Sequence, residues 1–203
     1  MAAICVYCAS SERINASYIA LASEVGVELA RRGHTLVTGG GSVSCMGAVA
    51  RAARAGGART IGVIPRVLVD LEVADHDADL LVVTEDMRER KGEMDRRSDA
   101  FLALPGGIGT LEELLEIWVA RTLGLHDKPL VVVDPSGFYR DLRAQCQRLL
   151  REGFLRDSAL DRLTWTTTPG EALDQIEAEL AAATAGATVR SRPEPGEILE
   201  AEP

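Results

Sequence analysis

Residues 105–113 combine a glycine-rich turn with two carboxylates, in the order Pro-Gly-Gly-Ile-Gly-Thr-Leu-Glu-Glu. An apolar run at 101–104 precedes the turn, and residues 114–118 after it are apolar at helical spacing. A glycine-rich turn between a buried strand and a helix exposes backbone N–H groups at the positive end of the helix dipole, which favours phosphate binding. Because Glu112 and Glu113 lie one helical turn further on, the pattern indicates chemistry on a phosphorylated sugar or nucleotide.

The same segment also has a purely structural interpretation. Thr110 and Glu113 have the spacing of a capping box, in which a hydroxyl and a carboxylate satisfy free backbone N–H groups at a helix start. Thr168 and Glu171 repeat this spacing, with Pro169 at the first helical position and no glycine turn before them. We interpret this second copy as structural. The first copy has more glycines than a cap requires, which favours the functional interpretation.

A second glycine-rich turn lies upstream. The short strand-like segment 35–38 leads into residues 39–47, Gly-Gly-Gly-Ser-Val-Ser-Cys-Met-Gly, and then into a helical run. One such turn is a weak signal, since it can also mark close packing of a helix on a sheet. Two of them at the carboxyl ends of strands favour a ligand held between them, at the edge where open α/β sheets bind ligands.

Arg90 and Lys91 are the candidate cationic ligands. At helical spacing they share one side of the expected helix with Met87 and Met94, and this helix begins after the strand-like run 80–84. Two interpretations stand: a solvated face with Glu–Arg pairs, or cations that reach the rim of the glycine turns and bind phosphate or carboxylate. Ser10, after the first strand-like run, is either an anion ligand or a turn residue.

Apolar strand-like runs alternate with helical patterns along the chain. The expected strands lie near 3–8, 34–38, 59–64, 80–84, 100–104 and 129–133, with a weaker one at 163–166. The expected helices lie near 15–32, 45–56, 87–98, 111–124, 137–152 and 169–183. Asn15 and Gly33 suit the N-cap and the C′ position of the first helix. The alternation predicts a Rossmann-like α/β fold, a doubly wound, mostly parallel sheet with helices on both faces in three layers.

Length and composition indicate a single globular domain. The chain has 203 residues, of which we assign 1–185 to one Rossmann-like domain and 186–203 to a disordered, acidic Pro/Glu-rich tail. No apolar run approaches the roughly 20 residues that span a bilayer, and no signal segment precedes the first strand, so we expect a cytoplasmic protein without membrane contact. The net charge of −9 argues against nucleic-acid binding.

The cysteines and histidines do not form a metal-binding pattern. Cys5 and Cys8 lie in one expected strand, where positions three apart point to opposite faces of the sheet. The three histidines have no ligand spacing, so we predict no metal site. Lys91 and Lys128 are the only lysines, which leaves two candidates for any chemistry that requires a lysine.

Taken together, these residues resemble the LOG ("lonely guy") family of cytokinin-activating phosphoribohydrolases, often misnamed lysine decarboxylases, and specifically a bacterial member. The family motif PGGxGTxxE is matched at every fixed position of 105–113. Its GGGxxGxMG loop corresponds to 39–47, and its Met-x-x-Arg-Lys pattern corresponds to 87–91. The similarity covers roughly residues 4–180. One departure is Ser44, where family members usually carry glycine, so the backbone of the first loop is less free to approach a ligand there.

The resemblance implies hydrolysis of the N-glycosidic bond of a cytokinin nucleoside 5′-monophosphate, and of AMP, to free base and ribose 5-phosphate, without a cofactor. It implies a catalytic pair, Arg90 and Glu113. The residues that it implies as nucleotide contacts are Glu72, Arg90, Lys91, Gly107, Ile108, Gly109, Thr110, Leu111, Glu112 and Glu113. To these we add, as further candidate binding residues, Ser10, Gly40, Gly41 and Met87.

Two other functions compete with this prediction. A pyridoxal-phosphate decarboxylase would need Lys91 or Lys128 as its Schiff-base lysine, and no cofactor-binding pattern surrounds either. A non-enzymatic nucleotide or molybdenum-cofactor carrier would need the glycine turns but not Glu113 with Arg90.

We also expect a homodimer, because residues 111–119 carry more apolar surface than one sheet face buries and because the resemblance implies dimers.

Overall fold

A seven-stranded parallel sheet forms the centre of the molecule, in a computed structural model that describes residues 1–69 and 73–185. The strands are β1 (Ala3–Tyr7), β2 (Thr35–Thr38), β3 (Thr60–Pro65), β4 (Leu80–Thr84), β5 (Ala100–Ala103), β6 (Leu130–Val133) and β7 (Thr164–Thr166). The helices are α1 (Ala16–Arg31), α2 (Ser44–Ala55), α3 (Arg66–Val69), α4 (Met87–Arg96), α5 (Ile108–Thr122), α6 (Arg140–Arg151), α7 (Asp157–Leu160) and α8 (Pro169–Ala185).

The sheet is doubly wound about β1. Its strand order is β4-β3-β2-β1-β5-β6-β7, so the chain first builds outward from β1 through β2, β3 and β4 and then returns to the other side of β1. In the register of the central strands, Ile4 lies opposite Leu36 on one side and Ala100 on the other. The turning point between β1 and β5 is the topological switch point, where open α/β sheets bind their ligands.

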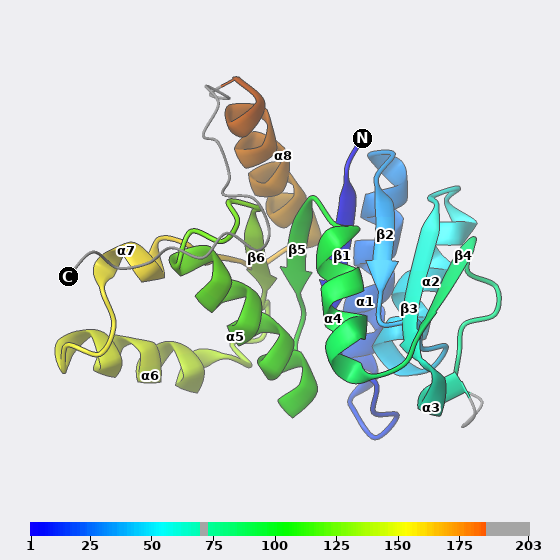
Figure 1. Cartoon of the computed structure of the whole chain (residues 1–203), viewed down its shortest axis with the longest axis horizontal. Helices are drawn as coiled ribbons and strands as arrows, with labels where there is room; N and C mark the ends of the chain where they lie inside the picture. The colour runs from blue at the N-terminus through cyan, green and yellow to red at the C-terminus, as the bar shows by residue number, and fades with distance from the viewer. Residues whose placement is uncertain (70–72, 186–203) are drawn as a thin grey trace, which may run out of the picture.

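Helices cover both faces of the sheet, which gives the three predicted layers (Figure 1). Apolar residues of α1, α2 and α8 share one buried cluster with Ile4 and Val6 of β1. Residues of α4, α5 and α6 share the other cluster with Cys5 and Tyr7. Side chains of β1 thus alternate between two cores, because successive residues of a strand point to opposite faces. This strand is buried on both faces, as its uninterrupted apolar sequence predicts.

The expected fold class is confirmed, with differences at the helix boundaries. α5 begins at Ile108 rather than at 111, because the backbone of Gly107 takes the N-cap position without help from a side chain. α6 begins at Arg140 rather than near 137, because the carboxylate of Asp134 accepts hydrogen bonds from the backbone of Phe138 and Tyr139 and holds a turn there. The short helices α3 and α7 were not predicted. The predicted tail, 186–203, lies outside the described residues.

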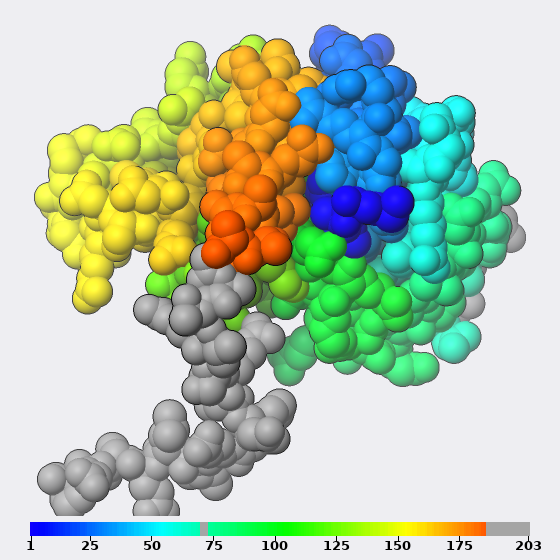
Figure 2. All heavy atoms as spheres, turned by 90° about the horizontal axis from the view of Figure 1, so that it is seen from above, coloured from blue at the N-terminus to red at the C-terminus, as the bar shows by residue number. Residues whose placement is uncertain are grey.

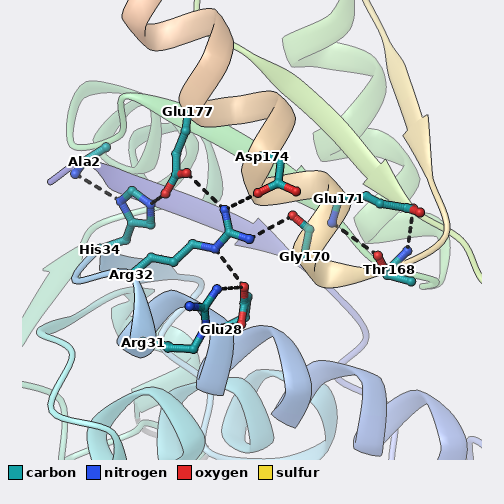
Figure 3. Close-up of polar contacts among 10 residues, drawn as sticks. All are labelled: Ala2, Glu28, Arg31, Arg32, His34, Thr168, Gly170, Glu171, Asp174 and Glu177. Carbon is teal, nitrogen blue, oxygen red and sulfur yellow. Dashed lines mark hydrogen bonds and ion pairs between the residues drawn. The ribbon is translucent and has the colours of Figure 1, made fainter.

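α8 is fixed to the C-terminal end of α1 by a network of charged side chains (Figure 3). The guanidinium of Arg32 lies 2.7 Å from Asp174, 3.0 Å from Glu177 and 2.7 Å from Glu28. The ring of His34 adds a 2.9 Å contact to Glu177. In the space-filling view, α8 (orange) accordingly lies against the blue N-terminal part of the chain (Figure 2).

The ends of α1 follow the sequence prediction. The Asn15 side chain accepts a hydrogen bond from the backbone N–H of Ser17 at 2.9 Å, and Gly33 has a φ of 71° just after the helix. These are the geometries of an N-cap and a C′ glycine. None of the helices in the described ranges is long and apolar enough to cross a membrane.

Candidate active site

A cavity of about 670 Å³ lies at the carboxyl ends of the central strands. Its walls come from the segments that follow β1, β2 and β5, together with parts of α1, α4 and α5. The two glycine-rich turns therefore face the same space, as the sequence predicts. Their position coincides with the switch point between β1 and β5.

The second glycine turn leaves the start of α5 open to this cavity. Gly107 is the N-cap and provides no side-chain acceptor, so the first N–H groups of the helix have no partner among the described residues. A Cβ atom at Gly106 would lie 2.2 Å from the Thr110 hydroxyl, so only glycine allows Thr110 to pack against the turn. Hypothetical Cβ atoms at Gly107 and Gly109 meet nothing within 4 Å, which leaves backbone accessible to a ligand. This is the geometry of an anion site at a helix N-terminus.

Arg90, from α4, is held by three different segments. Its Nε donates to the carbonyl of Val63 at 3.1 Å, and its Nη2 donates to the carbonyl of Gly39 at 3.3 Å. Its Nη1 donates to Glu113 Oε1 at 3.2 Å. A Cβ atom at residue 39 would lie 1.8 Å from Nη2, so the first glycine of the upstream turn makes room for the guanidinium. The arginine is thereby fixed in place with one edge toward Glu113.

Glu113 is a buried carboxylate with an altered acidity. Its side chain is 11% exposed, and Arg90 is its ion-pair partner. The pKa of Glu113 is raised to about 7: burial raises it most, the charge of Glu112 adds to the rise, and Arg90 and Lys91 act in the opposite direction. A carboxyl group with a pKa near 7 exchanges protons readily at neutral pH, as general acid–base chemistry requires.

Lys91 does not line the cavity, and its side chain contacts α5. Its ammonium contacts Glu112 and lies 2.6 Å from Glu116, so it joins α4 to α5. These two carboxylates raise the pKa of Lys91 and keep it charged. The neighbours Arg90 and Lys91 therefore have different partners: Arg90 lines the cavity and binds Glu113, whereas Lys91 binds Glu112 and Glu116.

The upstream turn contains an unusual backbone conformation. Ser44, the first residue of α2, has a φ of 51°, and within the described residues no other non-glycine residue has a positive φ. This left-handed conformation favours glycine, which gives a physical reason for the glycine that the family usually carries there. Gly40 has a φ of 73°, and the backbone of this turn pairs with 73–75 through hydrogen bonds at Ser42 and Asp75.

Most of the predicted site residues meet in the cavity. Those that line it are Ser10, Gly41, Met87, Arg90, Gly107, Ile108, Gly109, Thr110, Glu112 and Glu113. Gly40, Lys91 and Leu111 lie next to lining residues but do not line the cavity themselves. Glu72 lies outside the described residues.

Sequence reasoning missed the apolar wall of the cavity. The residues of this wall are Ile14 just before α1, Tyr18 in the first turn of α1, Met46 in α2 and Phe138 after β6. Tyr18 and Phe138 form an edge-to-face pair with ring centroids 5.8 Å apart. Each residue fits the pattern of a core or surface position in its own element, so the sequence contained no signal that they share a wall.

No metal-binding cluster of three or more His, Cys, Asp or Glu residues occurs in the described ranges. Cys5 belongs to one buried cluster and Cys8 to the other, so the two thiols lie on opposite sides of the sheet, as predicted. Lys128, the other lysine of the chain, lies 2.5 Å from Asp95 and does not line the cavity.

Comparison with known proteins identifies the family. A family profile described as "Possible lysine decarboxylase" matches residues 46–176. A cytokinin riboside 5′-monophosphate phosphoribohydrolase from Mycobacterium tuberculosis is 54% identical over 170 residues, which cover 84% of this chain and 90% of that protein. A relative of the same description from Arabidopsis thaliana is 40% identical over 174 residues, covering 86% of this chain and 81% of the relative. The chain belongs to this family, which confirms the resemblance to the LOG proteins.

Solved structures agree on the fold. The molybdenum cofactor binding protein from Rippkaea orientalis has a TM-score of 0.68 at 20% identity and covers 88% of this chain and 96% of its own. The Moco carrier protein from Chlamydomonas reinhardtii has a TM-score of 0.66 at 22% identity and covers 89% of this chain and 98% of its own. At this level of identity, the likeness concerns the arrangement of helices and strands.

Proposed function

We propose that this protein hydrolyses the N-glycosidic bond of cytokinin riboside 5′-monophosphates and of AMP, releasing the free base and ribose 5-phosphate. The observation that carries the proposal is the Arg90–Glu113 pair, buried beside the open N-terminus of α5 in one cavity. The names of the family members that are 40–54% identical to this chain support the same reaction.

In this proposal the nucleotide's phosphate binds at residues 107–110. The backbone N–H groups there suit an anion, and the glycines leave room for it. Binding of the phosphate anchors one end of the substrate and positions the ribose over the buried pair. Glu72, Ser10, Met87 and the upstream turn would contribute further contacts to the nucleotide.

Glu113 is the proposed catalytic carboxylate. As the C1′–N bond breaks, positive charge develops on the ribose, and an ionised carboxylate stabilises that charge. A water molecule adds to C1′ and loses a proton to Glu113, while the departing base takes up a proton from solvent at its ring nitrogen. Glu113 then releases its proton to solvent and is ready for the next turnover. Arg90 holds the Glu113 carboxylate in place and keeps part of its population ionised by lowering its pKa.

Lys91 has an indirect role in this proposal. Because its ammonium is bound to Glu112 and Glu116, it fixes α5 relative to α4 and offsets the negative charge around Glu113. Any direct contact of Lys91 with the nucleotide would require it to exchange one of these carboxylates for the phosphate.

The two competing functions have less support. A decarboxylase would need a lysine in the cavity, whereas both lysines are paired with carboxylates and neither lines it. A carrier would not need a buried ionisable pair, and the solved carrier structures share the fold at only 20–22% identity.

Product analysis tests the proposed reaction. We expect AMP and isopentenyladenosine monophosphate to yield the free base, measured by chromatography, while the corresponding nucleosides stay intact because they lack the phosphate anchor. Equal turnover of adenosine and AMP would contradict the assignment of residues 107–110 to phosphate.

The proposal includes a homodimer formed through α5. Leu115, Val119 and Leu123 follow one another at four-residue spacing and are 39%, 54% and 69% exposed. Ile108, at the cavity mouth, is 87% exposed. An apolar row of this kind favours a symmetric contact with a second copy. Light scattering at micromolar concentration is expected to give the mass of a dimer, and Val119→Arg is expected to shift it toward the monomer.

We further propose a cytoplasmic location. The four cysteines are buried and unpaired in the described structure, which suits a reducing compartment. Fractionation of cells that produce the protein tests this, and recovery outside the cytoplasmic fraction would contradict it.

A further inference from the structure

Ser44 combines two features that work against each other. Its φ of 51° places an L-residue in the left-handed region, where glycine is favoured. Its hydroxyl nevertheless donates a hydrogen bond of 2.6 Å to the carbonyl of Ser11, which lies 33 residues earlier in the chain. Glycine would relieve the backbone but would lose this bond. The chain therefore carries serine at a position whose backbone conformation favours glycine.

The hydrogen bond reaches the loop 9–14, which joins β1 to α1. In the described structure, residues 10–14 make no backbone–backbone hydrogen bond to another segment, and the backbone of Ala9 hydrogen-bonds the thiol of Cys45, the residue after Ser44. A hydrogen bond within the loop joins the N–H of Arg13 to the Ser11 hydroxyl at 3.3 Å. Ser44 is only 8% exposed. Its hydrogen bond to the loop is therefore shielded from water, which strengthens the bond.

This loop forms one wall of the substrate cavity. Ser10, Ser11 and Ile14 line the cavity together with the second glycine turn, whereas Ser44 itself does not line it. From this arrangement we propose that Ser44 is a positioning residue: its hydroxyl fixes the loop 9–14 against the start of α2 and so sets the shape of the nucleotide site. The inference rests on the proposed hydrolase function and adds a specific residue to it.

Two substitutions separate the hydrogen bond from the backbone conformation. Ser44→Ala loses the bond and keeps a Cβ atom in the left-handed region, whereas Ser44→Gly loses the bond and relieves the backbone. The glycine variant should therefore have the higher melting temperature of the two. The KM for AMP should rise by about fivefold in both, with kcat within about twofold of wild type, because the loop affects binding rather than the catalytic pair.

Proteolysis gives a readout that does not depend on catalysis. Arg13 offers trypsin a cleavage site inside the loop, and we expect cleavage after Arg13 to be several-fold faster in both variants than in wild type. Thr166→Val is the matched control, because the Thr166 hydroxyl also donates to a distant carbonyl, that of Val132 at 3.1 Å, but away from the cavity. It should change neither KM nor cleavage after Arg13.

The outcomes are distinct. Unchanged KM and unchanged cleavage in both Ser44 variants would overturn the inference, and so would changes confined to Ser44→Ala, which would trace them to backbone strain. A wild-type protein that leaves AMP intact would contradict the proposed function, and cleavage after Arg13 would still decide for or against the role of Ser44 in holding the loop.

Discussion

The two Thr-x-x-Glu segments of this chain differ in structure despite their identical spacing. At 168–171 the Glu171 N–H donates to the Thr168 hydroxyl at 3.2 Å, and the Thr168 N–H donates to the Glu171 carboxylate at 3.2 Å, which is a complete capping box (Figure 3). At 110–113 no such exchange occurs within the described structure. There Thr110 is buried in the first turn of α5, and Glu113 binds Arg90.

The residues before each segment explain the difference. Thr167 and Thr168 offer acceptors and donors just before Pro169, so α8 starts there. Before Thr110, glycine takes the N-cap position and α5 starts at Ile108, which moves Glu113 to the second turn and toward α4. The acidities diverge as well: burial raises the pKa of Glu113 to about 7, whereas hydrogen bonds from the Thr167 backbone and other groups of 167–168 lower the pKa of Glu171.

Glu113→Gln is expected to have the largest effect on catalysis. Turnover of AMP should fall by roughly 10²-fold or more, because an amide neither accepts the proton nor stabilises positive charge on the ribose. The measurement is kcat by chromatography of the released base, with circular dichroism to show that folding is intact. Near-normal turnover would remove the catalytic assignment and favour a carrier.

The same substitution should change how stability depends on pH. The pKa of Glu113 is raised from 4.5 to about 7 on folding, so the folded state holds the proton more tightly and stability falls as pH rises through that range. Ionisation of Glu113 in the folded protein lowers the free energy of unfolding by about 3 kcal/mol above pH 7. Glutamine does not ionise, so denaturant titrations should show a smaller loss of stability between pH 5 and pH 8 for the variant than for wild type.

Arg90→Ala should also reduce activity, by roughly tenfold or more, without unfolding the protein. Because Arg90 lowers the pKa of Glu113, its removal should raise that pKa further. If the ionised carboxylate is the active form, wild-type kcat/KM rises with pH up to about 7 and then levels off, and in the variant this rise should occur at higher pH. A pH profile identical to that of wild type would show that the pair does not act as one unit.

In the capping box at 168–171, by contrast with the Arg90–Glu113 pair, substitutions should affect stability and not activity. Thr168→Ala is expected to cost about 1 kcal/mol of stability and to leave turnover unchanged. Glu171→Gln should be silent in both assays, because glutamine also fills the last position of a capping box. Loss of activity in either variant would mean that α8 influences the site from the far edge of the sheet.

Much of the fold and part of the site could be predicted from the sequence. The alternation of strands and helices gave the parallel sheet, and the two glycine turns marked the edge where the cavity lies. The start of α5 could not be predicted well, because a glycine N-cap lacks the side-chain signal that Asn15 gives for α1. The partners of Arg90 are two backbone carbonyls, of Gly39 and Val63, and carbonyls carry no sequence signature.

The other features that could not be predicted depend on contacts between elements that are distant in the sequence. Lys91 and Arg90 are adjacent in sequence, yet only the packing of α4 on α5 assigns one to Glu112 and Glu116 and the other to Glu113. Likewise, Tyr18 and Phe138 meet because α1 and the turn after β6 lie at the same edge of the sheet. Periodicity describes each element alone and does not specify which elements meet.

The central place of β1 in the sheet has a consequence for synthesis of the protein. Ile4 pairs with Leu36 early, but its other neighbour, Ala100, emerges from the ribosome only after β2, β3 and β4. During that interval an apolar strand has an open edge, the kind of surface that recruits other chains. Slowing translation between residues 40 and 100 should therefore increase aggregation of the nascent protein and its need for chaperones.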